Sequence, residues 1–386
     1  MGRRHISELD GFRAIAVLWV LLHHALYGWT HAVYGWTDAQ HALDGWPKLV
    51  TFVLNRGWLG VDLFFVLSGF LITGILLDSR VNEHYWKHFY ARRALRILPV
   101  YLAVVLVYAL FYRGYGPYFG LSLVMVANLA GFFGVPVPHG PGVFWSLSVE
   151  EHFYMIWPLM VWLLSRRKLA ILAAALVVMV PIARGLGATF GVDPEAIYSY
   201  SWFRFDGLAL GALMATWVRS SRCTQQKSFY VVTGLIAAAI LITIGGWPFG
   251  LMKTATVAST ALRYTQVQLI FAAAILASVT MQGSSWTAPL RSRFARITSN
   301  YSYCMYLIHL AVGDAFMYWF GPGGATAVNL GPSAFLLLRL AVMLAASYAV
   351  AAMSYRFLEQ PCLRLKRYFD DKPQRKPAET CSFSAS

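Results

Sequence analysis

Long apolar stretches, separated by short polar segments, make up most of the chain. A helix needs roughly 20 mostly apolar residues to cross the hydrocarbon core of a bilayer. Stretches that approach this requirement lie at about 12–30, 58–78, 97–112, 144–164, 169–187, 201–218, 229–246, 261–281, 299–320 and 333–355. The pattern therefore predicts an all-α, polytopic integral membrane bundle with about ten transmembrane helices.

Lysine and arginine residues indicate the orientation of these spans, because cytoplasmic loops of membrane proteins are enriched in both. If the N-terminus is cytoplasmic and the short apolar piece 118–133 does not cross, 23 of the 32 Lys and Arg residues fall in cytoplasmic segments. If 118–133 did cross, every later basic loop would lie outside. We therefore expect both termini in the cytoplasm, and 118–133 as a re-entrant or outer-surface segment.

The composition is typical of a membrane protein. Hydrophobic residues make up 58% of the chain and charged residues only 13%, whereas soluble domains carry about a quarter charged residues. The formal net charge of +15 collects in the predicted cytoplasmic loops, so it indicates orientation and not a nucleic-acid partner. The four cysteines show no paired spacing, which argues against a disulfide framework or a metal site.

No large soluble domain is expected. The sequence predicts one transmembrane domain over 1–361 and a cytoplasmic, disordered tail over 362–386, because the end of the chain is polar and aperiodic. The apolar stretch after the N-terminus lacks a small-residue cleavage site, so we expect it to be a permanent span and not a removed signal peptide.

The first predicted outer loop contains a short repeat, YGWTHAV followed by YGWTDAQ, over Tyr27–Gln40. Tryptophan beside aspartate can stack on sugars and hydrogen-bond to them. Tryptophan at this depth is more typical of an interfacial aromatic belt, which is the interpretation we favour.

Ionisable residues inside a span are costly and therefore mark functional candidates. The first span carries Arg13 at its cytoplasmic end and His24 past its middle, and their spacing of eleven residues corresponds to about three helical turns, or about 16 Å. Both lie on one helix face, with Asp10 placed to orient Arg13. An arginine can grip a phosphate, and a histidine can accept a proton from a hydroxyl. The alternative for His24 is a hydrogen bond to a neighbouring helix.

A second candidate is KHFYARRALRILPVY, at the start of the third predicted span. Arg93 and Arg96 are three residues apart and share a helix face. Such a pair suits the polyphosphate of a soluble donor at the inner surface. The alternative is positive-inside anchoring, which every basic loop here shares and which spacing alone favours.

The third candidate is WSLSVEEHFYMIWPL, residues 145–159. Polar residues recur every four positions through Glu150, so they form a stripe on one helix face. Glu150 and Glu151 enter the bilayer near its outer side, where a carboxylate needs a partner such as a histidine or a sugar hydroxyl. Pairing with Arg204 or Arg339 is an equally open alternative.

Three further features favour a structural role over chemistry. Arg204 and Asp206, in RFDGLALGAL, are expected to pair with each other or across helices. His309 belongs to a polar stripe in SYCMYLIH. Arg356 and Glu359, in YRFLEQP, are three residues apart and are expected to form a local ion pair.

At these residues the sequence resembles the acyltransferase 3 family, over nearly the whole chain from about Leu9 to Pro361. LDGFRAIAVLWVLLHH resembles the opening of the family, with its Arg-x10-His at Arg13 and His24. GVDLFFVLSGFLIT, over Gly60–Thr73, matches a stretch that composition alone does not single out.

The remaining matches follow in the family's order. RRALRILPVY resembles the Arg-x-x-Arg element, at Arg93 and Arg96. WSLSVEEHFYMIWPL resembles the most distinctive block, with His152 where glutamine is common. RFDGLALGAL, SYCMYLIH and YRFLEQP resemble the later blocks. Seven ordered matches make the resemblance specific.

The resemblance implies ten spans and an acyl donor bound from the cytoplasm, usually acetyl-CoA. It also implies essential roles for Arg13 and His24, and acylation of a carbohydrate near or across the bacterial inner membrane. Family members include O-acetyltransferases of lipopolysaccharide, exopolysaccharide and peptidoglycan, and some macrolide acyltransferases. Larger relatives carry a C-terminal extracytoplasmic hydrolase-like domain. We expect none here, so transfer is either direct or completed by a separate partner.

We therefore predict a membrane-bound O-acyltransferase without a permanently bound cofactor. It would move an acyl group, by family default acetyl, from cytoplasmic acyl-CoA to a hydroxyl of a cell-surface or lipid-linked glycan. Arg13, Arg93 and Arg96 are expected to guide acyl-CoA, His24 to act as base or nucleophile, and Glu150 to orient His24 or the acceptor. Supporting roles are assigned to Asp10, Glu151, Arg204, Asp206 and His309.

Other functions fit parts of the same pattern. The acceptor could be a small molecule, as for macrolides, and the chain could work as a homo-oligomer. A transporter or flippase for a lipid-linked glycan would also use polar stripes inside a bundle. A haem-binding bundle would use His24 and His309 as axial ligands. Neither the transporter nor the haem protein explains the ordered set of motifs.

Overall fold

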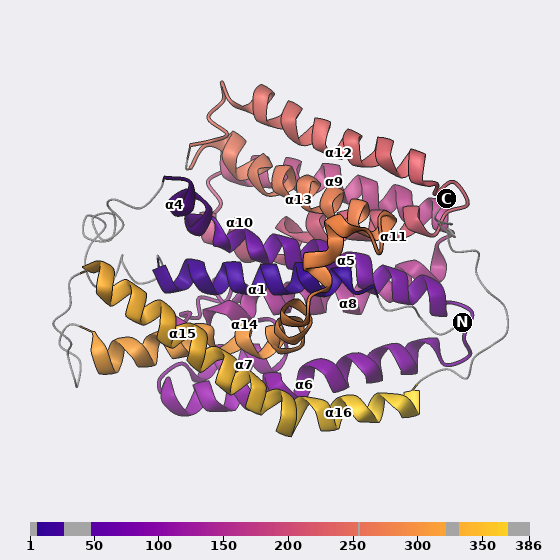
Figure 1. Cartoon of the computed structure of the whole chain (residues 1–386). Helices are drawn as coiled ribbons and strands as arrows, with labels where there is room; N and C mark the ends of the chain where they lie inside the picture. Colours follow the sequence, from indigo (N-terminus) through magenta and orange to yellow (C-terminus); the bar gives the residue numbers. More distant parts are fainter. Residues whose placement is uncertain (1–5, 27–47, 254, 322–331, 370–386) are drawn as a thin grey trace.

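The computed structural model describes residues 6–26, 48–253, 255–321 and 332–369, and these residues form helices and no strand (Figure 1). The long helices are α1 (Glu8–Leu26), α5 (Gly60–Ser79), α6 (Tyr85–Phe111), α8 (Phe144–Leu163), α9 (Arg166–Thr189), α11 (Phe205–Val218), α12 (Gln225–Gly246), α13 (Val257–Thr280), α14 (Arg293–Phe320) and α15 (Pro332–Ser354). The short elements are α4 (Lys48–Asn55), η1 (Gly57–Leu59), α7 (Gly116–Leu123), η2 (Ala127–Leu129), η3 (Gly140–Val143), α10 (Pro194–Ser199), η4 (Ser201–Phe203), η5 (Ser285–Arg291), η6 (Tyr355–Glu359), α16 (Gln360–Arg364) and η7 (Leu365–Phe369).

Each predicted span coincides with one long helix, which confirms the all-helical membrane architecture. Seven helical segments of the described chain are long and apolar enough to cross a membrane. α8, α11 and α14 are outside that group: α11 has only 14 residues, and α8 carries Glu150, Glu151 and His152 in sequence. The total of ten spans and the cytoplasmic location of both termini stay predictions.

Hydroxyl side chains fix where several of these helices begin. Ser165, Thr224, Thr256 and Ser292 each precede a long helix and accept a hydrogen bond from a backbone N–H of its first turn. These caps satisfy donors that have no partner inside the helix. Each cap lies at the junction between a polar loop and an apolar stretch.

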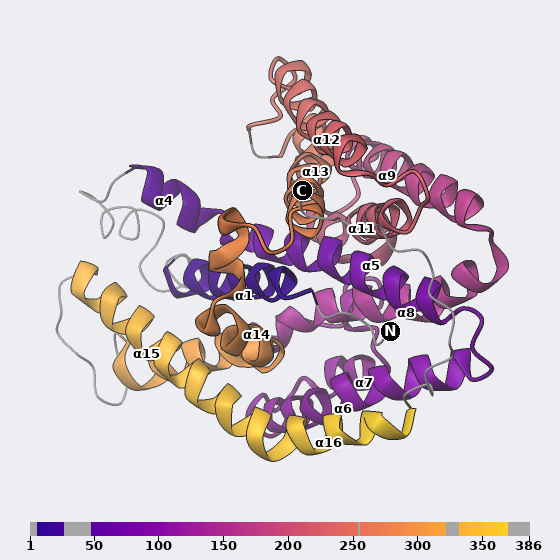
Figure 2. The same cartoon turned by 45° about the vertical axis from the view of Figure 1, so that its right-hand side comes forward.

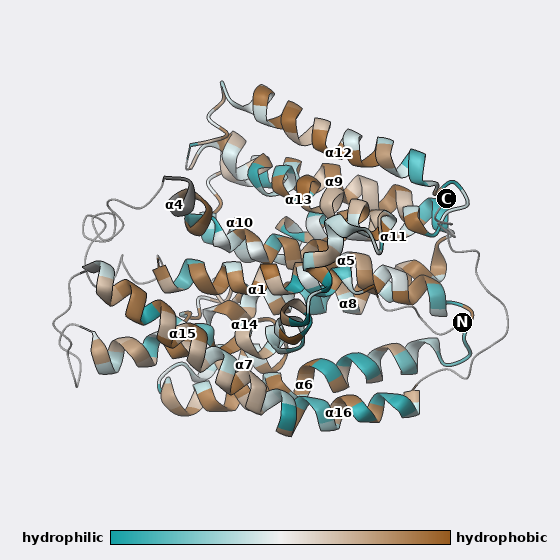
Figure 3. Ribbon diagram, viewed as in Figure 1, coloured by the Kyte–Doolittle hydropathy of each residue, from teal (hydrophilic) through white to brown (hydrophobic). Residues whose placement is uncertain are grey.

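α1 lies in the middle of the bundle, between two groups of helices (Figures 1 and 2). It packs against α5, α14 and α15. On one side, α5 packs against α11 and α13, which in turn contact α9 and α12. On the other side, α14 packs against α15 and α6, and α6 contacts α16. Hydrophobic residues cover most of the helices, and hydrophilic residues gather on α6 and α16 (Figure 3).

Contacts between helix ends agree with an alternating up-and-down path. Asp78, at the end of α5, pairs with Arg219 at the end of α11, with 2.6 Å between Oδ1 and Nε. The carbonyl of Trp162, at the end of α8, accepts a hydrogen bond from Arg80 at 2.8 Å. All of these ends are predicted to lie on the same side of the membrane. These three helix ends therefore meet at one end of the bundle.

The apolar piece 118–133 does not form a span. α7 contains eight residues, which is about 12 Å of helix and too short to cross a bilayer. The chain then turns at Met125, whose φ is 59°, and enters the three-residue η2. This agrees with the expectation that 118–133 does not cross.

The last helix continues further than the predicted domain boundary at residue 361. A π-helical turn, η6, joins α15 to α16, and Pro361 sits in the first turn of α16, where its missing N–H costs no hydrogen bond. Residues 362–369, which the sequence placed in the tail, are thus helical, and the carbonyl of Phe369 lies 3.5 Å from Nη1 of Arg92 on α6. Residues 370–386 lie outside the described residues, as does the repeat at Tyr27–Gln40.

Two glycines allow α5 and α11 to touch backbone to backbone. A Cβ atom on Gly69 would overlap the backbone of Leu208, and one on Gly211 would overlap the backbone of Val66 and Phe70. Small residues at a helix crossing permit the close van der Waals packing that drives association inside a membrane. The contact brings the first turns of α5 and α11 together, where charged residues meet.

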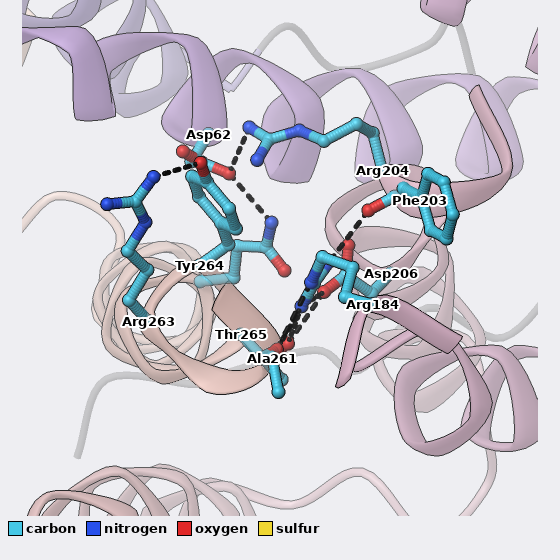
Figure 4. A network of polar contacts seen from close by, with 10 residues as sticks. Asp62, Arg184, Phe203, Arg204, Asp206, Ala261, Arg263, Tyr264 and Thr265 are labelled. Atoms are coloured by element: carbon cyan, nitrogen blue, oxygen red, sulfur yellow. Dashed lines mark hydrogen bonds and ion pairs between the residues drawn. The ribbon is translucent and has the colours of Figure 1, made fainter. Parts of the chain in front are cut away.

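Four charged side chains form two ion pairs across helices in this region (Figure 4). Arg204 pairs with Asp62 of α5 at 2.8 Å, and Arg184 of α9 pairs with Asp206 of α11 at 2.8 Å. All four side chains are fully buried. Thr265 of α13 donates to Asp206 at 2.7 Å. Of the two alternatives from the sequence, Arg204 and Asp206 therefore pair across helices and not with each other.

Replacing Gly211 by Ala should destabilise the bundle. The added methyl group would overlap α5, and overpacking of this kind costs about 1–3 kcal/mol. We expect a lower midpoint of thermal unfolding for the protein purified in detergent. Gly234→Ala is the matched control, because a Cβ there meets no atom within 4 Å. Equal midpoints for the two variants would contradict the close helix contact.

Replacing Asp62 by Asn should be more damaging. The change keeps the shape of the side chain but leaves Arg204 buried without its counter-charge, which costs about 3–5 kcal/mol. Asp78→Asn, at the partly exposed pair with Arg219, should cost about 0–1 kcal/mol. The measurement is again the midpoint of thermal unfolding in detergent. Similar decreases of the midpoint in both variants would contradict the claim that the buried pair contributes more to stability than the exposed one.

Candidate active site

A basic pocket lies at one end of the bundle, between α1, α6 and η7. Its volume is about 250 Å³, and none of its lining residues is acidic. The positively charged side chains that line it are Arg13, Arg92, Arg93, Arg96 and Lys366. The three arginines predicted to bind a donor therefore meet in one place, joined by Arg92 and Lys366.

The helices explain why these arginines converge. α6 begins at Tyr85, twelve residues before the predicted span, so Arg93 and Arg96 belong to a continuous helix and not to its frayed start. Arg13 lies 3.8 Å from Oδ1 of Asp10, one turn earlier on α1. The same Asp10 oxygen accepts a hydrogen bond from Ser299 of α14 at 3.1 Å. Asp10 thus lies beside Arg13, where the sequence placed it to orient that arginine, and it also contacts α14.

A pair of histidines lies further along the same two helices. Nε2 of His309, on α14, is 3.2 Å from Nδ1 of His24, on α1, and the ring centroids are 4.9 Å apart. Asp10 contacts Ser299 near the starts of these helices, and His24 contacts His309 further along both. α1 and α14 therefore run parallel, with the arginine pocket and the histidine pair separated by about three turns, or about 16 Å.

The hydrogen-bond partners assign the proton positions of the two neutral rings. Nδ1 of His309 lies 2.7 Å from the carbonyl oxygen of Tyr306. A carbonyl only accepts, so Nδ1 carries the proton and Nε2 is an acceptor. Nδ1 of His24 faces two acceptors, Nε2 of His309 and the carbonyl oxygen of Val20 at 2.9 Å. Nδ1 of His24 therefore carries the proton, which leaves Nε2 unprotonated and without a hydrogen-bond partner among the described residues.

Arg339 of α15 fixes the end of α1 at the histidine pair. Its Nη2 donates to the backbone carbonyl of His24 at 3.1 Å, and the side chain is almost fully buried. His23 points elsewhere, with Nδ1 3.1 Å from the carbonyl of Leu54. Of the two adjacent histidines, only His24 shows a contact with His309 among the described residues.

Glu150 occupies a different position from the one predicted. Its carboxylate accepts hydrogen bonds from Ser68 at 2.9 Å and from Tyr154 at 2.7 Å. The ring of Tyr154 lies under Arg93, with 4.8 Å from Cζ to the ring centroid. Among the described residues no contact joins Glu150 to His24, so Glu150 is linked to the arginine pocket and His309 is the neighbour of His24. Neither Arg204 nor Arg339 pairs with Glu150.

The structure also shows the surroundings of Glu151 and of the candidates that follow it in the sequence. One carboxylate oxygen of Glu151 is buried without a hydrogen-bond partner in the described part of the chain. Arg204 and Asp206 belong to the buried ion pairs, and Glu359 accepts a hydrogen bond from Ser354 at 3.4 Å. His309, which the sequence assigned to structure, contacts the predicted base His24.

The geometry of the histidine pair is unsuited to axial ligation of haem. Two axial imidazoles bind from opposite faces of the macrocycle, whereas the His24 and His309 nitrogens are within hydrogen-bond distance of each other. Within the described ranges, no group of three or more His, Cys, Asp or Glu side chains has the arrangement of a metal site. The arrangement suits proton transfer, with one ring orienting the other.

Comparison with known proteins gives consistent matches. The sequence matches the Acyl_transf_3 family, described as an acyltransferase domain, over residues 6–352. It is 27% identical over 391 positions to the peptidoglycan O-acetyltransferase OatA of Listeria monocytogenes, covering 93% of this chain and 56% of the relative. No solved structure matches the chain.

Two further relatives match over shorter regions. YrhL of Bacillus subtilis is 33% identical over 237 positions, covering 55% of this chain and 33% of the relative. The O-acetyltransferase OatA of Staphylococcus aureus is 28% identical over 236 positions, covering 55% of this chain and 34% of the relative. The chain thus spans about half the length of the first relative and about a third of the other two. Because the family match covers nearly all of the described bundle, including the arginine pocket and the histidine pair, the chain belongs to the acyltransferase 3 family.

Proposed function

We propose that this multi-pass membrane protein is an O-acyltransferase of the bacterial inner membrane. It transfers an acyl group, in the first instance acetyl, from cytoplasmic acyl-CoA to a hydroxyl of a cell-surface or lipid-linked glycan. One observation carries the proposal: a pocket rich in arginine and a histidine with a free lone pair lie on the same helix, about three turns apart. The similarity to a peptidoglycan O-acetyltransferase and to a second O-acetyltransferase supports acetyl transfer to a glycan.

The basic pocket suits the polyphosphate end of coenzyme A. Arginine binds phosphate oxygens through two parallel N–H donors, and five cationic side chains without an acidic neighbour in the lining match a highly charged anion. The pantetheine arm would then extend along α1 toward His24. Its thioester must reach about 16 Å from the phosphates, a distance that an extended arm can span.

At the other end, His24 would act as general base. Its Nε2 takes the proton of the acceptor hydroxyl while the hydroxyl oxygen attacks the thioester carbonyl. When the tetrahedral intermediate collapses, the carbon–sulfur bond breaks, and the CoA thiolate receives the proton back from His24. His309 would hold the ring of His24 in the required tautomer through the Nδ1–Nε2 hydrogen bond.

A two-step route uses the same residues. Nε2 of His24 attacks the thioester carbonyl first, the carbon–sulfur bond breaks, and the CoA thiolate leaves an acyl-imidazole on His24. The acceptor hydroxyl then attacks the acyl carbon, the carbon–nitrogen bond breaks, and the hydroxyl proton passes to the released Nε2. The two routes differ in one observable, because only the acyl-imidazole retains label from acyl-CoA on the protein before acceptor is added. Glu150, held by Ser68 and Tyr154 and linked through Tyr154 to Arg93, would position the donor in either route.

Mass spectrometry of envelope glycans tests the activity. Cells that lack the protein should lose an acyl mass that the wild-type gene restores. His24→Ala should fail to restore it at equal abundance in the membrane, because general-base catalysis contributes about 10²–10⁴ in rate. His309→Ala should slow transfer about a hundredfold or less, through misorientation of His24. Tyr230→Ala, an exposed side chain of α12 that does not line the pocket, is the control, and restoration by His24→Ala as by Tyr230→Ala would reject the mechanism.

Donor binding provides a separate prediction. Arg93→Gln and Arg96→Gln should each weaken binding of coenzyme A about 10- to 100-fold, because each removes a charge-assisted hydrogen bond worth about 1.5–3 kcal/mol. Lys366→Gln should act in the same direction with a smaller effect. Calorimetric titration of the protein in lipid nanodiscs measures these affinities. Arg356→Gln, outside the pocket, is the control, and unchanged affinity in the Arg93 and Arg96 variants would place the donor elsewhere.

A further inference from the structure

A line of aromatic rings connects the histidine pair to the end of the bundle opposite the arginine pocket. The ring of Tyr306 lies 5.8 Å from that of His309 and 6.1 Å from that of Phe64 on α5. The next residue on α5, Phe65, lies 6.0 Å from Trp145, which is at the start of α8. The line therefore passes from α14 to α8 through α5.

From Trp145 the line continues through segments that are far apart in sequence. Tyr198 of α10 lies 4.6 Å from Trp145 and 6.2 Å from Tyr264 of α13. Tyr264 in turn lies 5.7 Å from Trp58 of η1. Three of these rings, Trp58, Trp145 and Tyr198, are only half-buried, and so is Tyr306 beside His309. Each of these four rings therefore keeps a part of its surface exposed.

Arg204 holds this line of rings in place. Its Cζ lies 4.1 Å from the centroid of Tyr264, 5.4 Å from that of Tyr198 and 5.6 Å from that of Trp145. Its Nε and Nη1 are buried without a hydrogen-bond acceptor in the described residues, so these N–H groups face aromatic rings, which attract cations. Because Asp62 fixes Arg204 (Figure 4), the buried ion pair sets the positions of the rings.

This arrangement differs from an interfacial aromatic belt. Belt residues point outward, to the level of the lipid headgroups, whereas Trp145 and Tyr198 flank a guanidinium that has no solvent exposure. Polar groups are interspersed with the rings. Arg263, half-buried and 5.3 Å from the ring of Trp58, donates to the hydroxyl of Tyr264 at 2.6 Å. Ser146 is 2.5 Å from the hydroxyl of Tyr306.

Aromatic faces interrupted by hydrogen-bonding groups are the chemistry that recognises sugars. The C–H face of a pyranose stacks on an aromatic ring, while its hydroxyls bond to neighbouring polar side chains. We propose that Trp58, Trp145 and Tyr198 form a glycan-binding subsite that directs the acceptor hydroxyl to His24. The inference rests on the proposed function and adds to it the side chains that select a carbohydrate acceptor.

The test measures transfer kinetics of the full chain in nanodiscs, with acetyl-CoA as donor. The acceptor is the de-acylated envelope glycan prepared from cells that lack the protein. Trp58→Ala and Tyr198→Leu should each raise the acceptor KM about three- to tenfold, because each removes one aromatic face on which the sugar stacks. The affinity for coenzyme A should stay unchanged, which also shows that the variants are folded.

Two control variants separate stacking from general damage. Tyr198→Phe keeps the ring and should keep the acceptor KM. Trp247→Ala removes an exposed tryptophan of the same end of the bundle that belongs to no ring contact among the described residues, and should also leave KM unchanged. Wild-type acceptor KM in both Trp58→Ala and Tyr198→Leu would overturn the subsite while leaving the acyltransferase intact. Absence of transfer by the wild-type protein would overturn the proposed function itself, and the subsite with it.

Discussion

The cost of placing charge inside a bilayer determines how this bundle is built. A charged side chain in the interior of a membrane protein must find a partner or reach water, and two groups of arginines here meet that requirement in different ways. Arg204 and Arg184 are fully buried and bound to Asp62 and Asp206. The arginines around Arg13 instead share one open pocket whose lining has no acidic residue. The first group supports the fold, and the second is available to bind an anion.

α1 connects the anion-binding pocket to the candidate catalytic residues, because it carries Arg13 in the pocket and His24 in the histidine pair. Its contact with α14 is made at both levels, by Asp10 with Ser299 and by His24 with His309. The buried Arg339 holds the end of the helix at His24. The separation of the two sites is therefore fixed by a rigid helix, as expected for an enzyme that binds the phosphates of its donor far from the reacting carbonyl.

Much of the fold follows from the sequence, because membrane-spanning helices have a length and composition that can be read directly. The sequence also predicts that Arg13 and His24 share one helix face, as do Arg93 and Arg96, because each pair lies on one helix with a known period. Contacts between helices do not follow from periodicity.

For that reason the sequence assigned His309 to structure, although it lies against His24. It also proposed Glu150 to orient His24 or the acceptor, whereas the observed partners of Glu150 are Ser68 and Tyr154. Asp62 was missed because a single carboxylate in an apolar stretch gives no periodic signal. Lys366 was missed because Pro361 marks a helix end in most contexts, whereas here a π-helical turn carries the helix past it.

The central claim is that donor and acceptor reach His24 from opposite sides of the membrane. The most direct measurement uses sealed vesicles that contain the full chain in one known orientation, with radiolabelled acetyl-CoA outside and the de-acylated glycan inside. We expect labelled glycan when the arginine pocket faces the external buffer, and none when the vesicles have the opposite orientation. Equal labelling in both orientations, or labelling only when donor and acceptor share one side, would contradict transfer across the membrane through this bundle.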